Sequence, residues 1–268
     1  DITEQKQSEL QLQRKSNFEQ MISRLSTGFI NIDIEHVDVA IYQTLQQIVE
    51  FLETDRGYVF QKDPDSPTLR LTHDWCKKGV PSLLGDMGEI DFTKMEYGYE
   101  KLIKFDPLVI TSDFDLSLLS VPEKKLIEKY QMKSLILVPM VAGGEVKGIL
   151  GLDSTQNALH ANVETISLLR LAADMLQNTM ERKNFIQRIR KSEAISRAVL
   201  SSLAAHISVL DKDGTINAIN NSWRQYAREN GDPDLSSTGV GVNYLDVIDN
   251  VEGGPDRKDA EETAAGLR

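Results

Sequence analysis

The chain has 268 residues, of which 40% are hydrophobic and 26% are charged, a composition typical of folded globular proteins and not of disordered ones. Its formal net charge of −11 at pH 7, from 30 Lys and Arg against 41 Asp and Glu, disfavours nonspecific binding to nucleic acids and to anionic lipid surfaces. Because Cys76 is the only cysteine and no apolar run approaches the roughly 20 residues that span a bilayer, we expect a cytoplasmic protein without disulfides or direct membrane insertion.

Two helices are predicted at the start of the chain. Residues 3–17 are rich in good helix formers, and apolar side chains from Phe18 to Leu25 follow at helical spacing, so residues 1–25 predict one helix. Residues 37–53 predict a second, amphipathic helix, because apolar side chains recur there every three or four positions. The chain lacks an initiator Met, and we expect it to be a piece of a longer protein.

Shorter elements follow. Residues 56–61 and 68–75 predict a pair of strands, because the segment between them contains Asp and Pro residues that favour a turn. Residues 108–112 predict another strand, and residues 122–130 predict a short helix with Pro in its first turn. The aromatic segment 92–105 is compatible with a loop or with a short helix.

The most informative stretch is residues 134–153, where two apolar runs flank Gly143 and Gly144. Glycine adopts positive φ without strain, as a tight hairpin turn requires, so the runs predict two antiparallel strands. Their nearly continuous apolar character predicts cover on both faces and a place near the middle of a sheet. Pro139 cannot donate to a ladder and predicts an edge or a bulge at its position. The pattern as a whole predicts an α+β fold with an antiparallel sheet.

Residues 162–203 form the longest periodic segment and predict a helix well beyond the average of about 11–12 residues. Its apolar stripe includes Ile186 and Ile189, and Lys183 interrupts it, so no series of ideal heptads persists. We expect this helix to pair with its copy in a homodimer. The alternative is an ordinary C-terminal helix followed by a linker.

The last part of the chain predicts a smaller α/β segment. Residues 205–210 and 215–220 are apolar and flank Asp213-Gly214, a strong hairpin signal. Residues 222–228 then predict a helix.

The order of strand, Val-Pro, glycine turn, Lys-Gly, apolar strand and Leu-Asp-Ser within residues 134–154 resembles the GAF family of small-molecule and signalling domains. The resemblance extends over residues 18–184. It implies a GAF-like antiparallel sheet with helices on both faces, and a domain that senses and relays and seldom catalyses.

The resemblance also implies a ligand site between the sheet and the segment that covers one face, here residues 86–106. Aromatic walls with few polar groups are typical of such sites. The candidate ligand-binding side chains are Phe92, Met95, Tyr97 and Tyr99 from the cover, and Trp75 and Val138 from the strands. The alternative is that these six residues only fill the core.

Both ends of the chain resemble PAS domains. The opening DITEQK resembles the exit of a PAS domain, so residues 1–25 are interpreted as a signalling helix. The runs HISVLDKDGTINAINNSWRQYA and GVGVNYLDV resemble the start and a later loop of a PAS domain, which assigns residues 204–268 to its N-terminal part. Residues 185–203 would then be a connecting helix. An output domain, either a histidine kinase or a diguanylate cyclase, is expected beyond Arg268.

The sequence predicts no catalytic residues and no metal ligands. Gly143-Gly144-Glu145-Val146 lacks the second acidic residue that a cyclic-dinucleotide synthase needs. His73 and Cys76 lie three positions apart on a predicted strand and therefore point to opposite faces.

Three ligand chemistries of GAF relatives find little support. Bilin attachment would need a Cys-His neighbour pair, which Cys76 lacks, and methionine sulfoxide reduction would need two thiols. The motif of cyclic-nucleotide GAF domains is missing, although binding without it stays open. The sequence therefore requires no cofactor.

We therefore expect the sensory or regulatory module of a cytoplasmic signalling protein, of the kind found in two-component systems. It would bind a small ligand, or relay a conformational signal through dimeric terminal helices. The alternatives are a ligand-free structural dimerisation module and a redox-active GAF enzyme.

Overall fold

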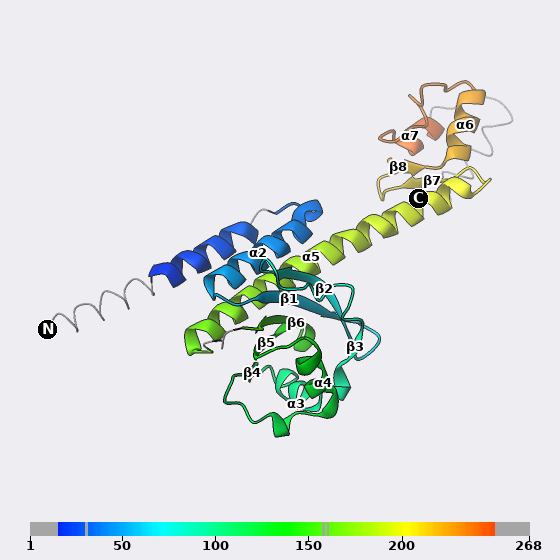
Figure 1. Ribbon diagram of the computed structural model, residues 1–268. Coiled ribbons are helices and arrows are strands. Elements are labelled where there is room, and N and C mark those ends of the chain that lie inside the picture. Colours follow the sequence, from blue (N-terminus) through cyan, green and yellow to red (C-terminus); the bar gives the residue numbers. More distant parts are fainter. Residues whose placement is uncertain (1–15, 30–31, 157–158, 160, 250–268) are drawn as a thin grey trace. The chain divides into compact units, whose positions relative to one another are not determined.

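The structure is a computed structural model that describes residues 16–29, 32–156, 159 and 161–249 (Figure 1). The chain divides into two compact units, residues 1–184 and 185–268, and each is described by itself. The helix α5 (Val163–Ser202) begins in the first unit and ends in the second. The part of the predicted N-terminal helix that covers residues 1–15 lies outside the described residues.

A six-stranded antiparallel sheet organises the first unit, with the strand order β3-β2-β1-β6-β5-β4. The strands are β1 (Arg56–Lys62), β2 (Thr68–Cys76), β3 (Ile90–Asp91), β4 (Leu108–Ile110), β5 (Ser134–Ala142) and β6 (Glu145–Ser154). The predicted pairing of the first two strands is confirmed, since β1 and β2 are antiparallel neighbours. β1 and β6 occupy the middle of the sheet.

The hairpin predicted within residues 134–153 is confirmed. β5 and β6 are adjacent and antiparallel, and the turn between them places Gly143 at φ 59° and Gly144 at φ 76°. Both values lie in the left-handed region that favours glycine. Pro139 lies beyond the end of β4, which pairs only with residues 135–137 of β5, so its missing N–H leaves the β4 ladder intact.

Helices cover both faces of the sheet, as Figure 1 shows. One face carries the helix of residues 16–29, α2 (Val37–Phe51) and the first part of α5. The other face carries α3 (Glu96–Leu102) and α4 (Val121–Lys129). The expected α+β class, with an antiparallel sheet between helices, is therefore confirmed. The remaining short helical turns are η1 (Ile34–His36), η2 (Phe92–Lys94) and η3 (Leu116–Leu118).

Two separate apolar cores result from this layering. The first core lies between the sheet and the three long helices, where buried residues such as Leu25, Leu45 and Leu168 meet. The second core lies between the sheet and α3 and α4, where Phe60, Leu102 and Ile149 are buried. The helix of residues 16–29 and α5 thus share the face opposite the second core, as the sequence predicted.

The second unit contains the end of α5, a short hairpin and two helices. β7 (Ser208–Leu210) and β8 (Ile216–Ile219) are antiparallel, and Gly214 in their turn has φ 85°. The helices α6 (Asn221–Glu229) and α7 (Tyr244–Asp249) follow. The predicted hairpin and the helix after it are confirmed, with shorter strands than expected.

One side chain, Asn220, holds the elements of the second unit together. Its amide nitrogen donates to the carbonyl oxygens of Leu200, Leu203 and Ala205 at 3.1, 3.2 and 2.7 Å. Its Oδ1 accepts from the backbone N–H groups of Ile207 and Trp223. Asn220 therefore fixes the end of α5 to the start of α6.

Candidate functional site

An apolar cavity of about 90 Å³ lies in the second core, between the sheet and α3 and α4. Almost all of its wall consists of aliphatic, aromatic and methionine side chains. The lining residues are Tyr58, Phe60, Leu69, Met87, Ile90, Phe92, Met95, Gly98, Leu102, Leu108, Ile110, Leu119, Glu123, Leu126, Ile127, Met132, Leu135, Leu137 and Ile149. A largely apolar space of this kind can take up small molecules.

Two of the six predicted site residues, Phe92 and Met95, line this cavity. Tyr99 and Tyr97 pack against the same core without lining the cavity. The ring of Tyr99 meets Phe92 edge to face, with centroids 5.0 Å apart, and so supports one wall. Tyr97 packs instead against Phe114.

Trp75 and Val138 lie on the opposite face, against the first core. Trp75 faces the first core, and not the cavity, because β2 contains a bulge. Val59 pairs with His73 and Phe60 pairs with Leu71, so Thr72 is an extra residue, and it reverses which side chains of β2 face each core. The periodicity of the sequence carries no sign of this bulge.

Val138 also faces the first core and not the cavity, but for a different reason. It alternates with its neighbours Leu135 and Leu137, which line the cavity, while Val138 packs with Ile136 in the first core. Because nearly every residue of this strand is apolar, the sequence does not tell which set faces which core.

Among the described residues that line the cavity, Glu123 is the one with a charged side chain, and it is 7% exposed. Its Oε1 accepts a hydrogen bond from the backbone N–H of Gly98 in α3, and its Oε2 accepts one from Ser120 before α4, both at 2.7 Å. The carboxylate thereby joins the first turns of two helices, where a negative charge is favourable. Sequence reasoning missed Glu123, although the Ser-x-x-Glu spacing from Ser120 is a capping signal.

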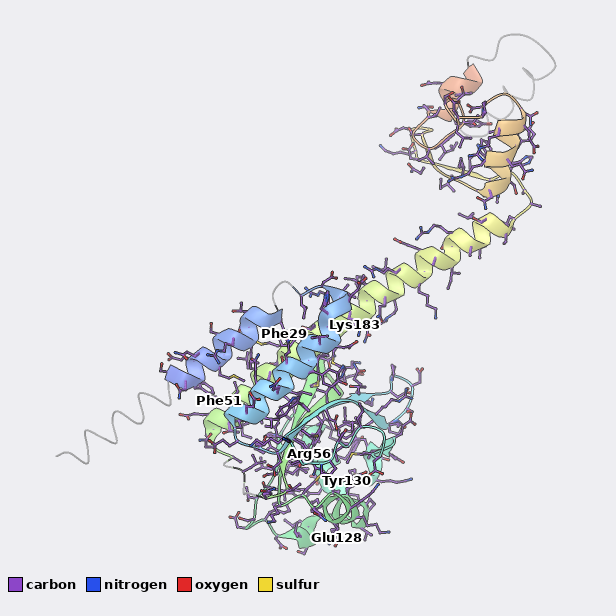
Figure 2. The ribbon with its side chains drawn as sticks, turned by 45° about the horizontal axis from the view of Figure 1, so that its top comes forward. Phe29, Phe51, Arg56, Glu128, Tyr130 and Lys183 are labelled. Atoms are coloured by element: carbon purple, nitrogen blue, oxygen red, sulfur yellow. The ribbon has the colours of Figure 1, made fainter. Side chains whose placement is uncertain are left out.

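A buried polar cluster borders the cavity on the sheet side. Arg56 Nε donates to Asp153 Oδ1 at 2.8 Å, and Arg56 Nη2 donates to the carbonyl oxygen of Tyr130 at 2.9 Å. Figure 2 shows Arg56 at the sheet and Tyr130 at the end of α4. The ring of Tyr58 lines the cavity and lies over Gly151, where a Cβ would stand 2.1 Å from it. The cluster thus connects α4, β1 and β6.

The ionisation of this cluster is strongly perturbed. Burial raises the pKa of Asp153 to about 6, and the charge of Arg56 offsets only part of that effect. Asp153 Oδ2 has no hydrogen-bond partner among the described residues. Burial and then the charge of Asp153 raise the pKa of Tyr58 well above its usual value.

Asp55 fixes the segment that leads from β6 towards α5. Its Oδ2 accepts hydrogen bonds from Ser154 Oγ, from the backbone and side chain of Thr155, and from the backbone of Gln156. Burial opposes ionisation of Asp55, but these hydrogen bonds outweigh it and hold its pKa below the usual value.

A second polar group links the helices of the other face. Lys183 Nζ in α5 contacts both carboxylate oxygens of Asp38 in α2, at 2.7 and 2.6 Å, and His73 Nε2 lies 3.2 Å from Asp38 Oδ1. Figure 2 shows Lys183 on α5. Lys183 interrupts the apolar stripe of this helix because it forms an ion pair with Asp38.

Cys76 lies outside the cavity. Its Sγ is 3.8 Å from Asp74 Oδ2 and from the carbonyl oxygen of Pro81. Burial, and then the charge of Asp74, raise the pKa of the thiol to about 12. Within the described part of the chain, no cluster of three His, Cys, Asp or Glu residues is arranged to hold a metal ion. The described helices include none with the length and apolarity needed to cross a membrane.

Comparison with known proteins identifies the family of this fold. Residues 36–180 match the family model described as GAF domain. A curated relative, an uncharacterized 104.1 kDa protein in the hypE 3' region of Rhodobacter capsulatus, is 42% identical over 72 residues. That segment covers 27% of this chain and only 8% of the relative.

Two solved structures from R. palustris share the fold. A bacteriophytochrome superposes with a TM-score of 0.53 at 14% identity, covering 72% of this chain and 42% of its own. The chromophore-binding domain of an unusual bacteriophytochrome superposes with a TM-score of 0.52 at 14% identity, covering 66% and 63%. At this identity the similarity concerns the fold.

Proposed function

Since this chain belongs to the GAF domain family, we propose that its first unit is the sensory module of a signalling protein and binds a small molecule in the cavity beneath α3 and α4. The observation that carries the proposal is the cavity itself. It is apolar, it lies between the sheet and two short helices, and it holds one buried carboxylate, Glu123. Apolar pockets with few, well-placed polar groups are the usual form of ligand sites.

The wall of the cavity has a physical connection to the helix that leaves the unit. Leu126 and Ile127 of α4 line the cavity, and the carbonyl of Tyr130 at the end of α4 is held by Arg56. Arg56 also holds Asp153 of β6. A ligand that moves α4 would therefore strain contacts at the strand that precedes α5. It transmits a signal only if it binds two conformations with unequal affinity.

The wider context of the module belongs to the same proposal. The hairpin and helix of the second unit support a PAS-like segment that receives the signal from α5. We propose that the terminal helices pair in a homodimer, and that the module acts in the cytoplasm upstream of a histidine kinase or diguanylate cyclase.

One of the two similar structures is a chromophore-binding domain. Binding of a chromophore does not fit this chain. A cavity of about 90 Å³ is well below the 300–1,000 Å³ of typical small-molecule sites. Cys76, the only thiol, does not line the cavity, and its pKa of about 12 keeps it protonated. The single cysteine also disfavours a redox-active enzyme.

One observation favours a second candidate, a structural dimerisation module without a ligand. The part of α5 beyond residue 184 carries exposed apolar side chains, including Phe185 at 62% and Val199 at 53% exposed. A helix with such a stripe is suited to pairing with another helix.

A thermal-shift titration separates the two candidates. A panel of compact aromatic compounds is added to the purified chain and to a Leu135→Phe variant, whose larger side chain fills the cavity. The sensor proposal predicts that compounds raise the melting temperature of the wild type, because they bind only the folded state, and not that of Leu135→Phe. Val138→Ile, three positions away but in the first core, is the matched control and should respond as the wild type does. A wild type that responds to no compound would favour the ligand-free module.

A further inference from the structure

The chemistry of the cavity wall restricts what it can bind, and this inference rests on the proposed function. We infer that the ligand is a compact, uncharged or cationic ring compound that carries an N–H donor directed at Glu123. Anionic ligands, including nucleotides and carboxylates, are excluded from this site.

The exclusion of anions follows from the lining. No Lys, Arg or His is among the described residues that line the cavity. A phosphate or carboxylate placed there would lose its hydration without gaining a cationic partner, which is strongly unfavourable. It would also meet the negative charge of Glu123, which is 7% exposed.

The preference for a donor follows from the hydrogen bonds that the carboxylate of Glu123 already accepts. An ionised carboxylate offers about four lone-pair positions. The backbone N–H groups of Gly98 and Ser120 take one position on each oxygen. No ion pair with Glu123 is formed within the described residues. Each oxygen therefore keeps capacity to accept, and a hydrogen bond to a charged acceptor is stronger than one between neutral groups.

The size limit follows from the volume. An engineered cavity of about 150 Å³ holds benzene, so about 90 Å³ suits a smaller ring. Met87, Met95 and Met132 line the cavity, and flexible, polarisable methionines adapt to a ligand better than branched side chains do. A five-membered ring is therefore the natural probe.

The test compares pyrrole with thiophene, two rings of similar size of which only pyrrole has an N–H. Dissociation constants for the intact chain are measured by NMR titration. We expect pyrrole to bind about tenfold more tightly, with a nuclear Overhauser effect from its N–H to the amide proton of Ser120 or Gly98. Acetate, an anionic probe smaller than either ring, should not bind.

Glu123→Gln provides the matched variant. Its neutral amide oxygen accepts a weaker hydrogen bond, so the preference for pyrrole should fall to about threefold or less. The variant also weakens the junction of α3 and α4, and if it does not fold, the wild-type comparison still decides. Equal binding of the two rings, or tighter binding of thiophene, overturns the donor inference and leaves the sensory proposal standing. Binding of neither ring overturns both.

Discussion

Arg56 and Asp153 form an ion pair whose side chains are 1% and 0% exposed, at the paired ends of the two central strands β1 and β6. Burial of two charges costs free energy, because both lose their hydration. A buried ion pair is stable only where good geometry and further hydrogen bonds offset that loss. Arg56 donates one such hydrogen bond to the carbonyl oxygen of Tyr130. The pair therefore joins the end of α4 to the two central strands of the sheet.

Replacement of Arg56 should destabilise the unit strongly. Arg56→Met leaves Asp153 buried without its cation and frees the end of α4, and removal of one partner of a buried pair costs about 3–5 kcal/mol. Urea unfolding at pH 7 measures the free energy of unfolding. Arg70→Met is the control, because Arg70 and Glu89 form an exposed pair worth at most about 1 kcal/mol. Equal effects of the two substitutions would refute a central role for the buried pair.

The raised pKa of Asp153 predicts a defined pH dependence. Its folded-state pKa of about 6 exceeds the ordinary 3.8, so the folded state binds the proton more tightly than the unfolded state does. The contribution of this proton binding to the free energy of unfolding is fully present below about pH 4 and is lost as the pH rises through about 6. The difference corresponds to at most about 3 kcal/mol.

Asp153→Asn removes this titration and leaves the other carboxylates in place. The free energy of unfolding of the wild type minus that of Asp153→Asn should therefore fall by up to about 3 kcal/mol between pH 4 and pH 7. The lowered pKa of Asp38, whose shift comes from Lys183 and His73, affects both proteins alike and cancels in the difference. A difference that rises or stays constant would contradict the assignment.

Cys76 should behave as a packing residue. With a pKa of about 12 against a usual 9.0, its thiolate fraction at pH 8 is about a thousandfold smaller than that of an ordinary cysteine. Alkylation by iodoacetamide should be slower in the folded chain than in urea by a similar factor. Cys76→Ser should leave the biological output of the protein largely intact. Rapid alkylation of the folded chain, or loss of output in a folded Cys76→Ser protein, would reveal a reactive role.

The dimer remains a prediction from the stripe on α5. Replacement of Ile186 and Ile189 by Lys places charge in the seam, so light scattering should show monomers while circular dichroism is unchanged. Replacement of Gln187 and Ala194 by Lys adds the same charge to exposed positions on the other side of the helix. That control should stay dimeric. If the Ile186 and Ile189 variant remains dimeric, the seam lies elsewhere.

The sheet and its helices could be predicted from the sequence because they depend on local signals. The glycines at positions 143 and 144 and the runs around them specify the central hairpin, and the spacing of apolar residues specifies α2 and α5. The cover of the cavity was harder to predict, since η2 and α3 are short and their aromatic residues carry no clear period.

The candidate site could be predicted only in part. Phe92 and Met95 were predicted correctly because they lie in the aromatic-rich segment that covers one face of the sheet, and such a segment is expected to line a ligand site. Trp75 was assigned to the wrong core because the extra residue Thr72 changes the alternation of β2. Arg56 and Asp153 are 97 residues apart, and nothing local to either reveals that the sheet brings them together.

The central claim is that the cavity in the second core admits a small molecule, and methyl NMR of the seven methionines tests it most directly. With ¹³C-methyl methionine and pyrrole as the probe, the signals of Met87, Met95 and Met132 should shift on titration. The remaining methionines, Met21, Met140, Met175 and Met180, belong to the first core or pack against it and should not shift. Unchanged signals for all seven, or shifts confined to the latter four, would contradict the account.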